Sequence, residues 1–359
     1  MQKDSTNRIF EMTVADLFAG VGGMSEGFRM AGFNIKFAVE FDKEIAAAYG
    51  LNHAGTEVIA KDICEVDVEA LHKKYPTIDV IMGGPPCQGF SQKGKRLSLD
   101  DPRNFLFQQF VRFVKEFKPK YFVLENVPNI VTTSNGFFKN QIVEAFEKIG
   151  YKVCYGVLCA ADFGVPQDRR RAVFLGQKGK LEIGLPQPKN IRTTIKEAIY
   201  DLPFIGSGSG EEISSYDKQP FSEYQKFMRK NSNVLYNHVA TKHNASALKR
   251  LSMIPKGAGK EVLPPEERTK SIYSGTWSRM LEDDISVTIT TRYDTPSSGR
   301  FTHPILDRCI TTREAARIQS FPDTFRFYGS KTSQMKQVGN AVPPLLAKVI
   351  AELLKNNEI

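Results

Sequence analysis

One stretch of the chain reads Val80-Ile81-Met82-Gly83-Gly84-Pro85-Pro86-Cys87-Gln88-Gly89-Phe90-Ser91. Its apolar start predicts a buried strand, and Gly-Gly-Pro-Pro predicts a stiff, tight loop where that strand ends. The loop delivers a lone cysteine, Cys87, to the carboxyl end of the strand, where open α/β sheets place their ligands. A second apolar run, Tyr121-Phe122-Val123-Leu124, is followed by Glu125. The sequence therefore predicts a nucleophile and a carboxylate at the ends of two strands of one sheet.

The first 180 residues alternate strand-like and helix-like runs. Strands are predicted at residues 12–18, 35–40, 57–60, 79–82, 121–125, 152–158 and 171–175. Helices are predicted at residues 24–30, 43–49, 105–117 and 138–149. This alternation predicts an α/β fold, a doubly wound and mostly parallel sheet with helices on both faces.

The composition changes after Leu185-Pro186-Gln187-Pro188, which predicts a linker. The residues up to about 310 show few periodic runs and many Ser, Thr, Gly and Pro, which favours a smaller, loop-rich second domain. Helical patterning returns at residues 312–319 and 342–354, and we expect the last helix to fold back onto the first domain. We predict a catalytic and cofactor-binding domain of residues 1–185 plus 334–359, and a second domain of residues 186–333.

The bulk composition, with 41% hydrophobic and 25% charged residues, is typical of a soluble globular protein. No apolar run approaches the roughly 20 residues of a membrane span, and the N-terminal residues lack the apolar stretch of a signal peptide, so we expect a cytoplasmic protein without membrane contact. The five cysteines and five histidines are scattered, which predicts neither a disulfide framework nor a metal site.

The net charge of +9 favours a polyanionic partner. Residues 221–260 interleave basic and aromatic side chains. This pattern fits contact with a phosphate backbone, and it fits equally well a solvated helix face with its aromatic residues turned inward.

A second candidate site lies near the N-terminus, where the first predicted strand runs into Phe18-Ala19-Gly20-Val21-Gly22-Gly23-Met24-Ser25. Glycines at a strand-to-helix turn let a cofactor approach the backbone and the start of the helix. Glu40, at the end of the next strand, can accept both hydroxyls of a ribose, and Asp62 can accept from an adenine amino group. The dinucleotide fingerprint would need glycine at position 25, where this chain has Ser25. Asp16 suits the cationic amino-acid end of S-adenosylmethionine better than a pyrophosphate.

The candidate reacting groups suit one reaction. A thiolate at Cys87 is the nucleophilic form of cysteine, and Glu125 is a positioned acid or hydrogen-bond partner. In Gln167-Asp168-Arg169-Arg170-Arg171, Arg171 opens an apolar strand, and Arg169 is expected to point the same way by the period of two. A structural cysteine, a solvated carboxylate and surface arginines are the plain alternatives. Together these groups fit methylation of cytosine at C5, in which thiolate addition at C6 activates C5 while a carboxyl at N3 and a guanidinium at O2 stabilise the developing charge.

The chain resembles the DNA cytosine-C5 methyltransferases of bacterial restriction-modification systems over nearly its whole length, with six blocks in that family's order. They are Asp16-Leu17-Phe18-Ala19-Gly20-Val21-Gly22-Gly23, Pro85-Pro86-Cys87-Gln88, Glu125-Asn126-Val127, Gln167-Asp168-Arg169-Arg170-Arg171, Arg313-Glu314-Ala315-Ala316-Arg317-Ile318-Gln319-Ser320-Phe321-Pro322 and Gln337-Val338-Gly339-Asn340-Ala341-Val342-Pro343-Pro344. The resemblance implies a Rossmann-like S-adenosylmethionine-dependent methyltransferase fold of two lobes, with a DNA cleft between them and residues 186–333 as the target recognition domain.

The resemblance also implies roles for individual residues. Cys87 would attack C6, Glu125 would bind and protonate N3, and Arg171, grouped with Arg169, would contact the flipped base. The cofactor site would be lined by Phe18, Gly20, Val21, Gly22, Gly23, Glu40, Phe41, Asp62, Ile63, Pro85, Leu106, Asn340 and Val342. Phe41 stands where relatives often have tryptophan. DNA would be contacted by Ser91, Lys93, Lys95 and Arg96 of a mobile loop and by Arg292 and Arg300 of the variable region.

These resemblances imply transfer of a methyl group from S-adenosylmethionine to C5 of a flipped cytosine in a short specific sequence of double-stranded DNA, through a covalent bond between Cys87 and C6. We expect a monomeric, DNA-associated modification enzyme whose cognate endonuclease acts separately. A tRNA methyltransferase on the same scaffold is the closest alternative, although such enzymes tend to have Pro-Phe-Thr where this chain has Gly89-Phe90-Ser91. A non-catalytic relative would have lost Cys87 or Glu125. An oxidoreductase is disfavoured by Ser25 and the Pro-Pro-Cys loop, and a methyltransferase for exocyclic nitrogens would carry tyrosine or phenylalanine after the two prolines.

Overall fold

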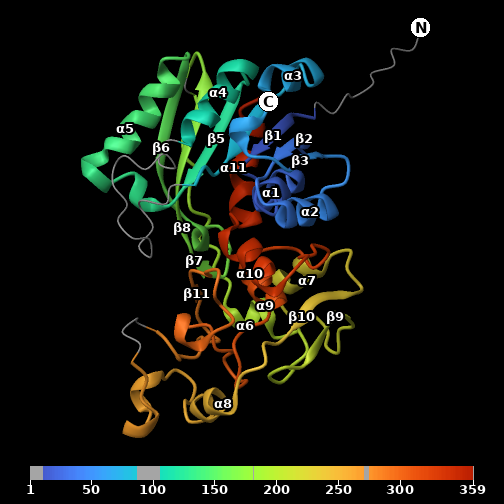
Figure 1. Ribbon diagram of the computed structural model, residues 1–359, viewed down its shortest axis with the longest axis vertical. Helices are drawn as coiled ribbons and strands as arrows, with labels where there is room; N and C mark the ends of the chain where they lie inside the picture. The colour runs from blue at the N-terminus through green and yellow to red at the C-terminus, as the bar shows by residue number, and fades with distance from the viewer. Residues whose placement is uncertain (1–10, 87–105, 181, 271–274, 359) are drawn as a thin grey trace.

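The computed structural model describes residues 11–86, 106–180, 182–270 and 275–358 of the 359-residue chain. A seven-stranded sheet forms the upper half of the molecule in the view of Figure 1, with the strand order β3-β2-β1-β4-β5-β8-β6. The strands are β1 (Thr13–Leu17), β2 (Asn34–Val39), β3 (Glu57–Ile59), β4 (Val80–Gly83), β5 (Tyr121–Asn126), β6 (Tyr151–Cys159) and β8 (Arg170–Lys178).

The sheet is mostly parallel, as predicted, but β8 runs antiparallel to both β5 and β6. The connection from β6 to β8 is too short for the helical crossover that a parallel pair needs, so the chain turns back instead. The strand order reverses between β2 and β4, on either side of β1. Open α/β sheets bind ligands in the crevice at such a switch point, outside the carboxyl ends of the strands.

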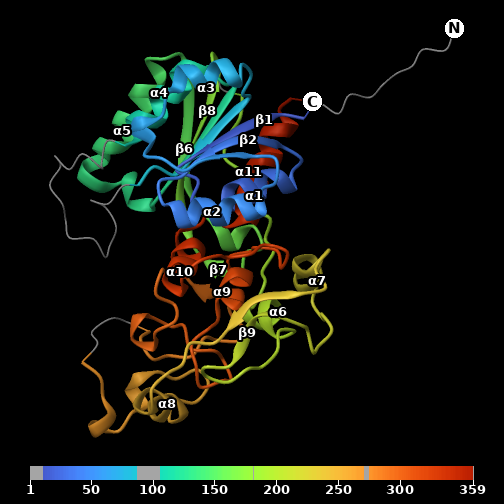
Figure 2. The same ribbon diagram turned by 45° about the vertical axis from the view of Figure 1, so that its right-hand side comes forward.

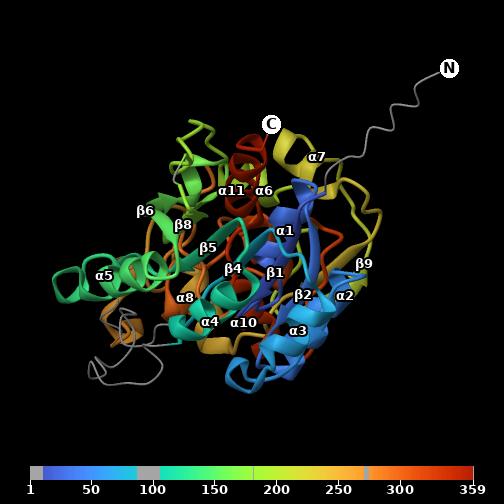
Figure 3. The same cartoon turned by 90° about the horizontal axis from the view of Figure 1, so that it is seen from above.

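Helices cover both faces of the sheet, as the alternation of strands and helices predicted. These helices are α1 (Gly23–Met30), α2 (Lys43–Asn52), α3 (Val68–Lys74), α4 (Phe107–Phe117), α5 (Thr133–Glu147) and α11 (Pro344–Asn356). Side chains of α3, α4 and α5 pack on one face against residues such as Leu17, Ile81 and Leu124. Side chains of α1 and α11 pack on the other face against the alternate residues Val14 and Val80, and Figure 3 shows α11 on the side of the sheet opposite α3 and α4.

The last helix does return to the sheet. Glycine at position 27 allows the close contact, because a Cβ atom there would lie 2.4 Å from the carbonyl oxygen of Pro344. Fully buried side chains such as Phe28 and Leu346 form this interface, and each stabilises the fold by roughly 1.5–3 kcal/mol.

The lower half contains shorter elements, which Figure 2 shows from a second side. They are β7 (Gln167–Asp168), β9 (Gly210–Ser214), β10 (Leu235–Val239), β11 (Ser286–Val287), α6 (Ile195–Ile199), α7 (Glu223–Arg229), α8 (Ala245–Ser252), α9 (Thr312–Ile318) and α10 (Lys331–Asn340). Strands β9 and β10 form an antiparallel pair, and β7 and β11 form a parallel one.

Single 3-10 turns occur in both halves of the molecule. They lie at Ile63–Glu65, Pro128–Ile130, Ala160–Asp162, Lys260–Val262, Pro265–Glu267 and Pro296–Ser298.

A third core joins the two halves. Ile310, Ile318 and Val338 of the lower half pack with Val21 and Ile45 of the upper half. Helix α10 runs across residue 334, where the sequence placed a domain boundary. The boundaries at 186 and 334 stay predictions. In the ranges that the structure describes, no helix has the length and apolar character needed to cross a bilayer.

Candidate active site and cofactor site

The carboxyl ends of β1, β4 and β5 and the start of β8 meet at one edge of the sheet. Residues Glu125 and Asn126 pair with Val173 and Ala172 in the antiparallel register of β5 and β8, which places Arg171 beside the end of β5. The sequence-predicted carboxylate and guanidinium are therefore brought together by strand pairing alone.

Glu125 and Arg171 form a nearly buried ion pair. Arg171 Nε lies 2.7 Å from Glu125 Oε1, and the two side chains are 14% and 13% exposed. Burial raises the pKa of Glu125 above its usual value, although the charges of Arg171 and Arg169 oppose the shift. A carboxyl group in this setting can hold a proton near neutral pH more readily than an exposed one.

The loop that follows β4 is fixed to β5 by Asn126, a residue whose role the sequence did not single out. Its side-chain nitrogen donates to the carbonyl oxygen of Pro85 over 2.8 Å. Gly84 packs against the carboxyl group of Glu125, because a Cβ atom there would lie 2.8 Å from Glu125 Oε2. Cys87 itself lies outside the described residues, as do Ser91, Lys93, Lys95 and Arg96.

Arg169 comes just before β8, and its expected direction alongside Arg171 stays a prediction. The backbone N–H of Arg169 donates to the carbonyl oxygen of Gln167, a tight turn that breaks the strand between β7 and β8. The fully buried guanidinium donates to the carbonyl oxygens of Ile289 and Gly339 over 3.1 and 2.9 Å. A catalytic role for Arg169 stays a prediction, and its geometry is that of a residue that positions its surroundings.

Gln167 completes a clamp with Arg169. Its side-chain oxygen accepts from the N–H of Ile289 over 2.7 Å, and its side-chain nitrogen donates to Gln319 Oε1 over 2.9 Å. This clamp, Gln167 with Arg169, ties residues 286–289 of the lower half to the strand that carries Arg171.

The glycine turn after β1 closes on the end of β2. Glu40 Oε2 accepts from the N–H of Gly20 over 2.8 Å, and burial raises the pKa of Glu40. Gly22 has φ of 93°, and a Cβ atom there would lie 2.4 Å from the ring of His53, so this position requires glycine. Beside the turn, the Phe41 ring is 72% exposed.

The other predicted cofactor residues come from several elements. A Cβ atom at Gly23 would lie 2.3 Å from the carbonyl oxygen of Val342, so the C-terminal motif contacts the start of α1. Asp62 accepts from the N–H of Cys64 over 2.9 Å, and Ile63 is buried. Pro85 is buried, Leu106 and Phe18 are partly buried, and Asn340 is exposed at the end of α10.

Asp16, at the end of β1, is fully buried. Its Oδ2 accepts from Ser25 Oγ over 2.6 Å, and Ser25 Oγ lies 2.7 Å from the hydroxyl of Tyr49. Among the described residues no donor reaches Asp16 Oδ1. Burial raises the pKa of Asp16 to about 7.

The two candidate DNA-reading arginines differ in setting. Arg292 is exposed and follows directly on the clamped segment 286–289, whereas Arg300 is partly buried beside Gly275. Several basic residues of the 221–260 stretch are paired within the protein. Arg229 stacks over Tyr216 and binds Asp201, and Lys249 and Arg250 both bind Glu267. The aromatic residues of the stretch are divided, with Phe221 and Phe227 exposed and Tyr224 and Tyr236 partly buried, so both interpretations stay predictions.

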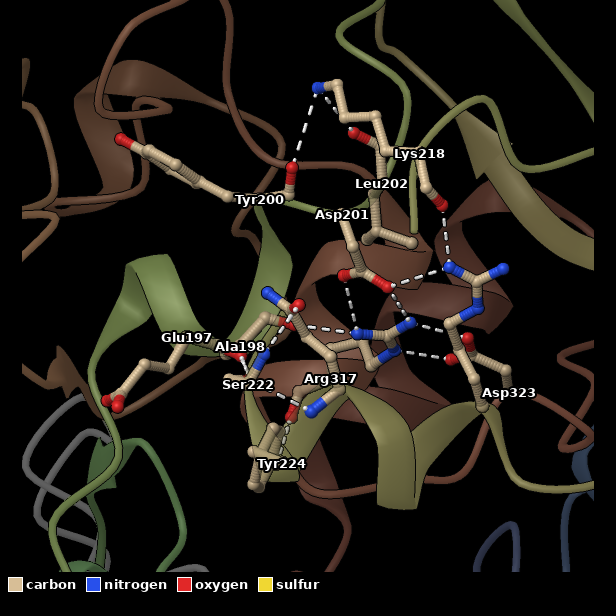
Figure 4. Close-up of polar contacts among 12 residues, drawn as sticks. Glu197, Ala198, Tyr200, Asp201, Leu202, Lys218, Ser222, Tyr224, Arg317 and Asp323 are labelled. Carbon is tan, nitrogen blue, oxygen red and sulfur yellow. Dashed lines mark hydrogen bonds and ion pairs between the residues drawn. The ribbon is translucent and has the colours of Figure 1, made fainter. Parts of the chain in front are cut away.

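Helix α9 carries a buried network that the sequence did not predict (Figure 4). Arg317 binds Asp323 through Nε and Nη2 over 2.5 and 2.6 Å, and binds Asp201 through Nη1 and Nη2 over 3.1 and 3.2 Å. All three side chains are fully buried. The signal in the sequence is weak, because Arg317 is one of two arginines in a short helix that also carries Glu314. No cluster of metal-ligating side chains occurs among the described residues.

Comparisons with known proteins cover nearly the whole chain and indicate one family. A family model for the C-5 cytosine-specific DNA methylases matches residues 12–356. The Type II methyltransferase M.DdeI of Desulfomicrobium norvegicum is 41% identical, over 95% of this chain and 88% of the relative. The Type II methyltransferase M1.HphI of Haemophilus parahaemolyticus is 40% identical, over 96% of this chain and 87% of the relative.

Solved structures of methyltransferases also align with nearly the whole chain. A crystal structure described as a DNA modification methyltransferase encoded within a prophage (E. coli) aligns with a TM-score of 0.79 and 30% identity, covering 96% of this chain and 99% of that one. The Dnmt2 methyltransferase of S. pombe aligns with a TM-score of 0.61 at 16% identity, over 97% of this chain and 100% of that one, which shows likeness of fold alone.

Proposed function

The chain belongs to the C-5 cytosine-specific DNA methylase family, and we propose that it methylates C5 of a cytosine flipped out of double-stranded DNA, through a covalent bond between Cys87 and C6. The enzyme class, a DNA (cytosine-5-)-methyltransferase, follows from the family match and the curated relatives. The covalent step, the flipped base and the roles of single residues are the content of the proposal.

One observation carries the proposal most directly. The buried pair of Glu125 and Arg171 presents a carboxyl and a guanidinium side by side at the sheet edge, next to the loop that leads to Cys87. A protonated carboxyl can donate to N3 of cytosine, and a guanidinium can donate to O2. Flipping is required because C5 and C6 cannot be reached inside a duplex.

In the proposed reaction, each bond that forms is matched by a bond that breaks or an electron pair that shifts. The Cys87 thiolate forms a bond to C6, the electron pair of the C5–C6 double bond shifts into the ring, and N3 receives the proton of Glu125. Bound S-adenosylmethionine would supply an electrophilic methyl group to C5, and the electron pair of the broken C–S bond would stay on the cofactor's sulfur, which leaves as a neutral thioether. The proton on C5 leaves to a base, the C5–C6 double bond forms again, the thiolate of Cys87 departs, and N3 returns its proton to Glu125.

The cofactor end of the sheet fits S-adenosylmethionine. The unpartnered Oδ1 of Asp16 suits a cationic amino group, and Glu40 suits a ribose. The exposed ring of Phe41 offers a surface on which adenine can stack. We propose that Gly20, Gly22, Asp62 and Val342 complete the site.

The restriction-modification context is proposed from the relatives, which are named as Type II methyltransferases. We propose that residues 186–333 read the DNA sequence, that the enzyme acts as a monomer and that a cognate endonuclease acts separately.

The decisive test is methyl transfer from labelled S-adenosylmethionine to unmethylated DNA and, in parallel, to bulk tRNA, followed by bisulfite sequencing of the DNA. We expect label on DNA, with 5-methylcytosine confined to one short motif. Label on tRNA alone would assign the enzyme to RNA, and label on neither would leave a binding protein.

Two variants test the covalent step in the same assay. Cys87→Ala should abolish transfer, whereas Cys154→Ala, at a half-buried position of β6, should retain it. DNA with 5-fluorocytosine at the target should trap a denaturation-stable adduct with the wild-type protein, because the final elimination is blocked. Retained transfer by Cys87→Ala would refute Cys87 as the nucleophile.

A further inference from the structure

The carboxyl group of Asp16 is enclosed, and among the described residues no positive charge lies beside it. It has no exposed surface, and Ser25 is the donor to its Oδ2. Across the described part of the chain, no cation pairs with this carboxyl and no donor reaches Oδ1. Burying a carboxylate with one bare oxygen costs several kcal/mol, and a group in that position keeps its proton instead.

The elements packed around Asp16, as far as the structure describes them, bring no compensating positive charge. Its partners in β2 and β4, Ala38 and Met82, are uncharged. From α1 come the Ser25 hydroxyl and Glu26, whose charge is taken up by Arg29 through bonds of 2.7 and 2.9 Å.

The remaining neighbours are Tyr49 from α2 and Glu40 at the end of β2. Burial raises the pKa of Asp16 to about 7, the Ser25 hydrogen bond acts in the opposite direction, and the charge of Glu40 adds to the rise. The pKa of Tyr49 also lies well above its usual value because of burial, so its hydroxyl stays neutral and can donate to Ser25. Every titratable group around Asp16 therefore favours its protonated form or leaves it unchanged.

We infer that Asp16 holds a proton on Oδ1 in the cofactor-free protein and releases it when the α-ammonium group of the cofactor binds there. The inference rests on the proposed function, because it takes S-adenosylmethionine as the ligand. The exchange balances: a neutral carboxylic acid and a bound ammonium become a carboxylate–ammonium pair, and one proton passes to the buffer. Cofactor binding is then coupled to pH by a residue that takes no part in the chemistry at cytosine.

The test is calorimetric titration of the full chain, without DNA, with S-adenosylmethionine at pH 6.0 in buffers of low and high ionisation enthalpy. The ligand's own α-amino group is fully protonated there, because such groups titrate at about 7.7–8.0, so the ligand contributes no proton. With the pKa of Asp16 at about 7, we expect release of about 0.9 protons per cofactor bound.

Matched variants and ligands identify the source of the proton. Asp16→Asn should bind S-adenosylmethionine without releasing a proton and with at least about tenfold lower affinity, because a charge-assisted hydrogen bond is lost. Glu40→Gln should weaken binding yet keep the release, which separates the two carboxyl groups whose pKa values burial raises. 5′-Methylthioadenosine, which lacks the ammonium group, should bind the wild type without release.

Ser25→Ala supplies a second, graded test that does not remove the carboxyl. Loss of the donor to Oδ2 should raise the pKa of Asp16 further, so this variant should release more protons than the wild type at pH 7.5. The contribution of the ligand is common to both proteins and cancels in the comparison.

The outcomes separate the inference from the proposed function. Wild-type binding whose enthalpy is the same in all buffers would overturn the inference and leave the function standing. Equal proton release by Asp16→Asn would assign the proton to another group and overturn it as well. If the wild type does not bind S-adenosylmethionine at all, the proposed function fails with it.

Discussion

Only glycine fits at position 84, beside the carboxyl group of Glu125. A Cβ atom on Gly84 would lie 2.8 Å from Glu125 Oε2, closer than real Cβ atoms approach a heavy atom. The carboxyl and its partner Arg171 are nearly buried, so they cannot move into open solvent to relieve the contact. The glycine before the two prolines is thus a condition of the active-site geometry.

Gly84→Ala should therefore lower activity more than stability. A shift of about 1 Å in a positioned group can cost on the order of 100-fold in rate, and we expect a loss of that size in single-turnover methylation. Gly184→Ala, at a position with nothing within 4 Å of the new atom, is the control and should leave both rate and unfolding unchanged. Equal rates for the two variants would show that Glu125 is not held where the chemistry needs it.

Glu125→Gln should slow the addition step by roughly 10²–10⁴-fold, the range of a lost general acid. In the wild type, the rate should fall as pH rises through the raised pKa of Glu125, because only the protonated carboxyl can give a proton to N3. The variant should lose this part of the pH profile. Glu116 on α4 lies in a half-exposed pair with His72 on α3, and Glu116→Gln is the matched control. An unchanged single-turnover rate in Glu125→Gln would remove that residue from the mechanism.

At this scale the sequence predicts well where the signal is local. Glu125 ends one apolar run and Arg171 opens another, and the structure brings the two side chains together. The direction of Arg169 stays a prediction, because alternation holds only within an unbroken strand and a turn at Asp168 lies beside it. The side-chain role of Asn126 is missing from the prediction since it depends on the path of the 84–86 loop.

Among the elements, helix α9 is held against α6 and the residues that follow α6 by ion pairs as well as by apolar packing. Arg317 satisfies Asp201 and Asp323 together, and it also donates to the carbonyl oxygen of Ala198 over 2.8 Å. The charge of Arg317 holds the pKa of Asp323 below its usual value. An acid with a lowered pKa stabilises the fold above its unfolded pKa, so this contribution should be lost as pH falls through the native value.

Arg317→Met should lower the free energy of unfolding by about 3–5 kcal/mol, because two buried carboxylates lose their partner. Arg192→Met, which breaks an exposed pair with Asp284, should change it by about 1 kcal/mol or less. Urea unfolding at pH 7 measures both. A small effect for Arg317→Met would mean that Asp201 and Asp323 find other partners or protonate at little cost.

Elements with a strong period were predictable and the others were not. The sheet strands and helices α1, α2, α4 and α5 carry clear patterns, and their predicted ranges overlap those in the structure. Helix α10 was missed because its sequence, Lys331-Thr-Ser-Gln-Met-Lys-Gln-Val-Gly-Asn340, is largely polar and buries much of that polar surface against other elements. Helices α7 and α8 each present few buried side chains, and their stability depends on contacts distant in the chain.

For the whole molecule, the excess of positive charge is a weaker guide to DNA contact than it first suggests. The net charge is +9, yet Lys226, Arg229, Lys249, Arg250 and Lys256 of the basic stretch each pair with an acidic residue. Arg292 is exposed and lies next to the segment that Gln167 and Arg169 hold. Position relative to the active site, rather than local charge density, should identify the DNA-contacting cations.

Arg292→Ala should weaken DNA binding and reduce the slope of log K against log salt concentration by about 1, the expectation for one lost phosphate contact. Lys249→Ala should leave the slope unchanged, because Lys249 is engaged with Glu267. Fluorescence anisotropy over a salt series measures both. A reduced slope for Lys249→Ala alone would return the basic stretch to the DNA interface.

The clamp of Gln167 and Arg169 has a consequence for how such proteins diversify. It grips the lower half largely through main-chain atoms, namely the N–H and carbonyl of Ile289 and the carbonyls of Ile318 and Gly339. Contacts to main-chain atoms do not depend on which side chains the bound segment carries. If residues 186–310 read the target sequence, as proposed, they can differ between relatives while the strand bearing Arg171 keeps its course. New target sequences can then arise without changes to the proposed catalytic residues.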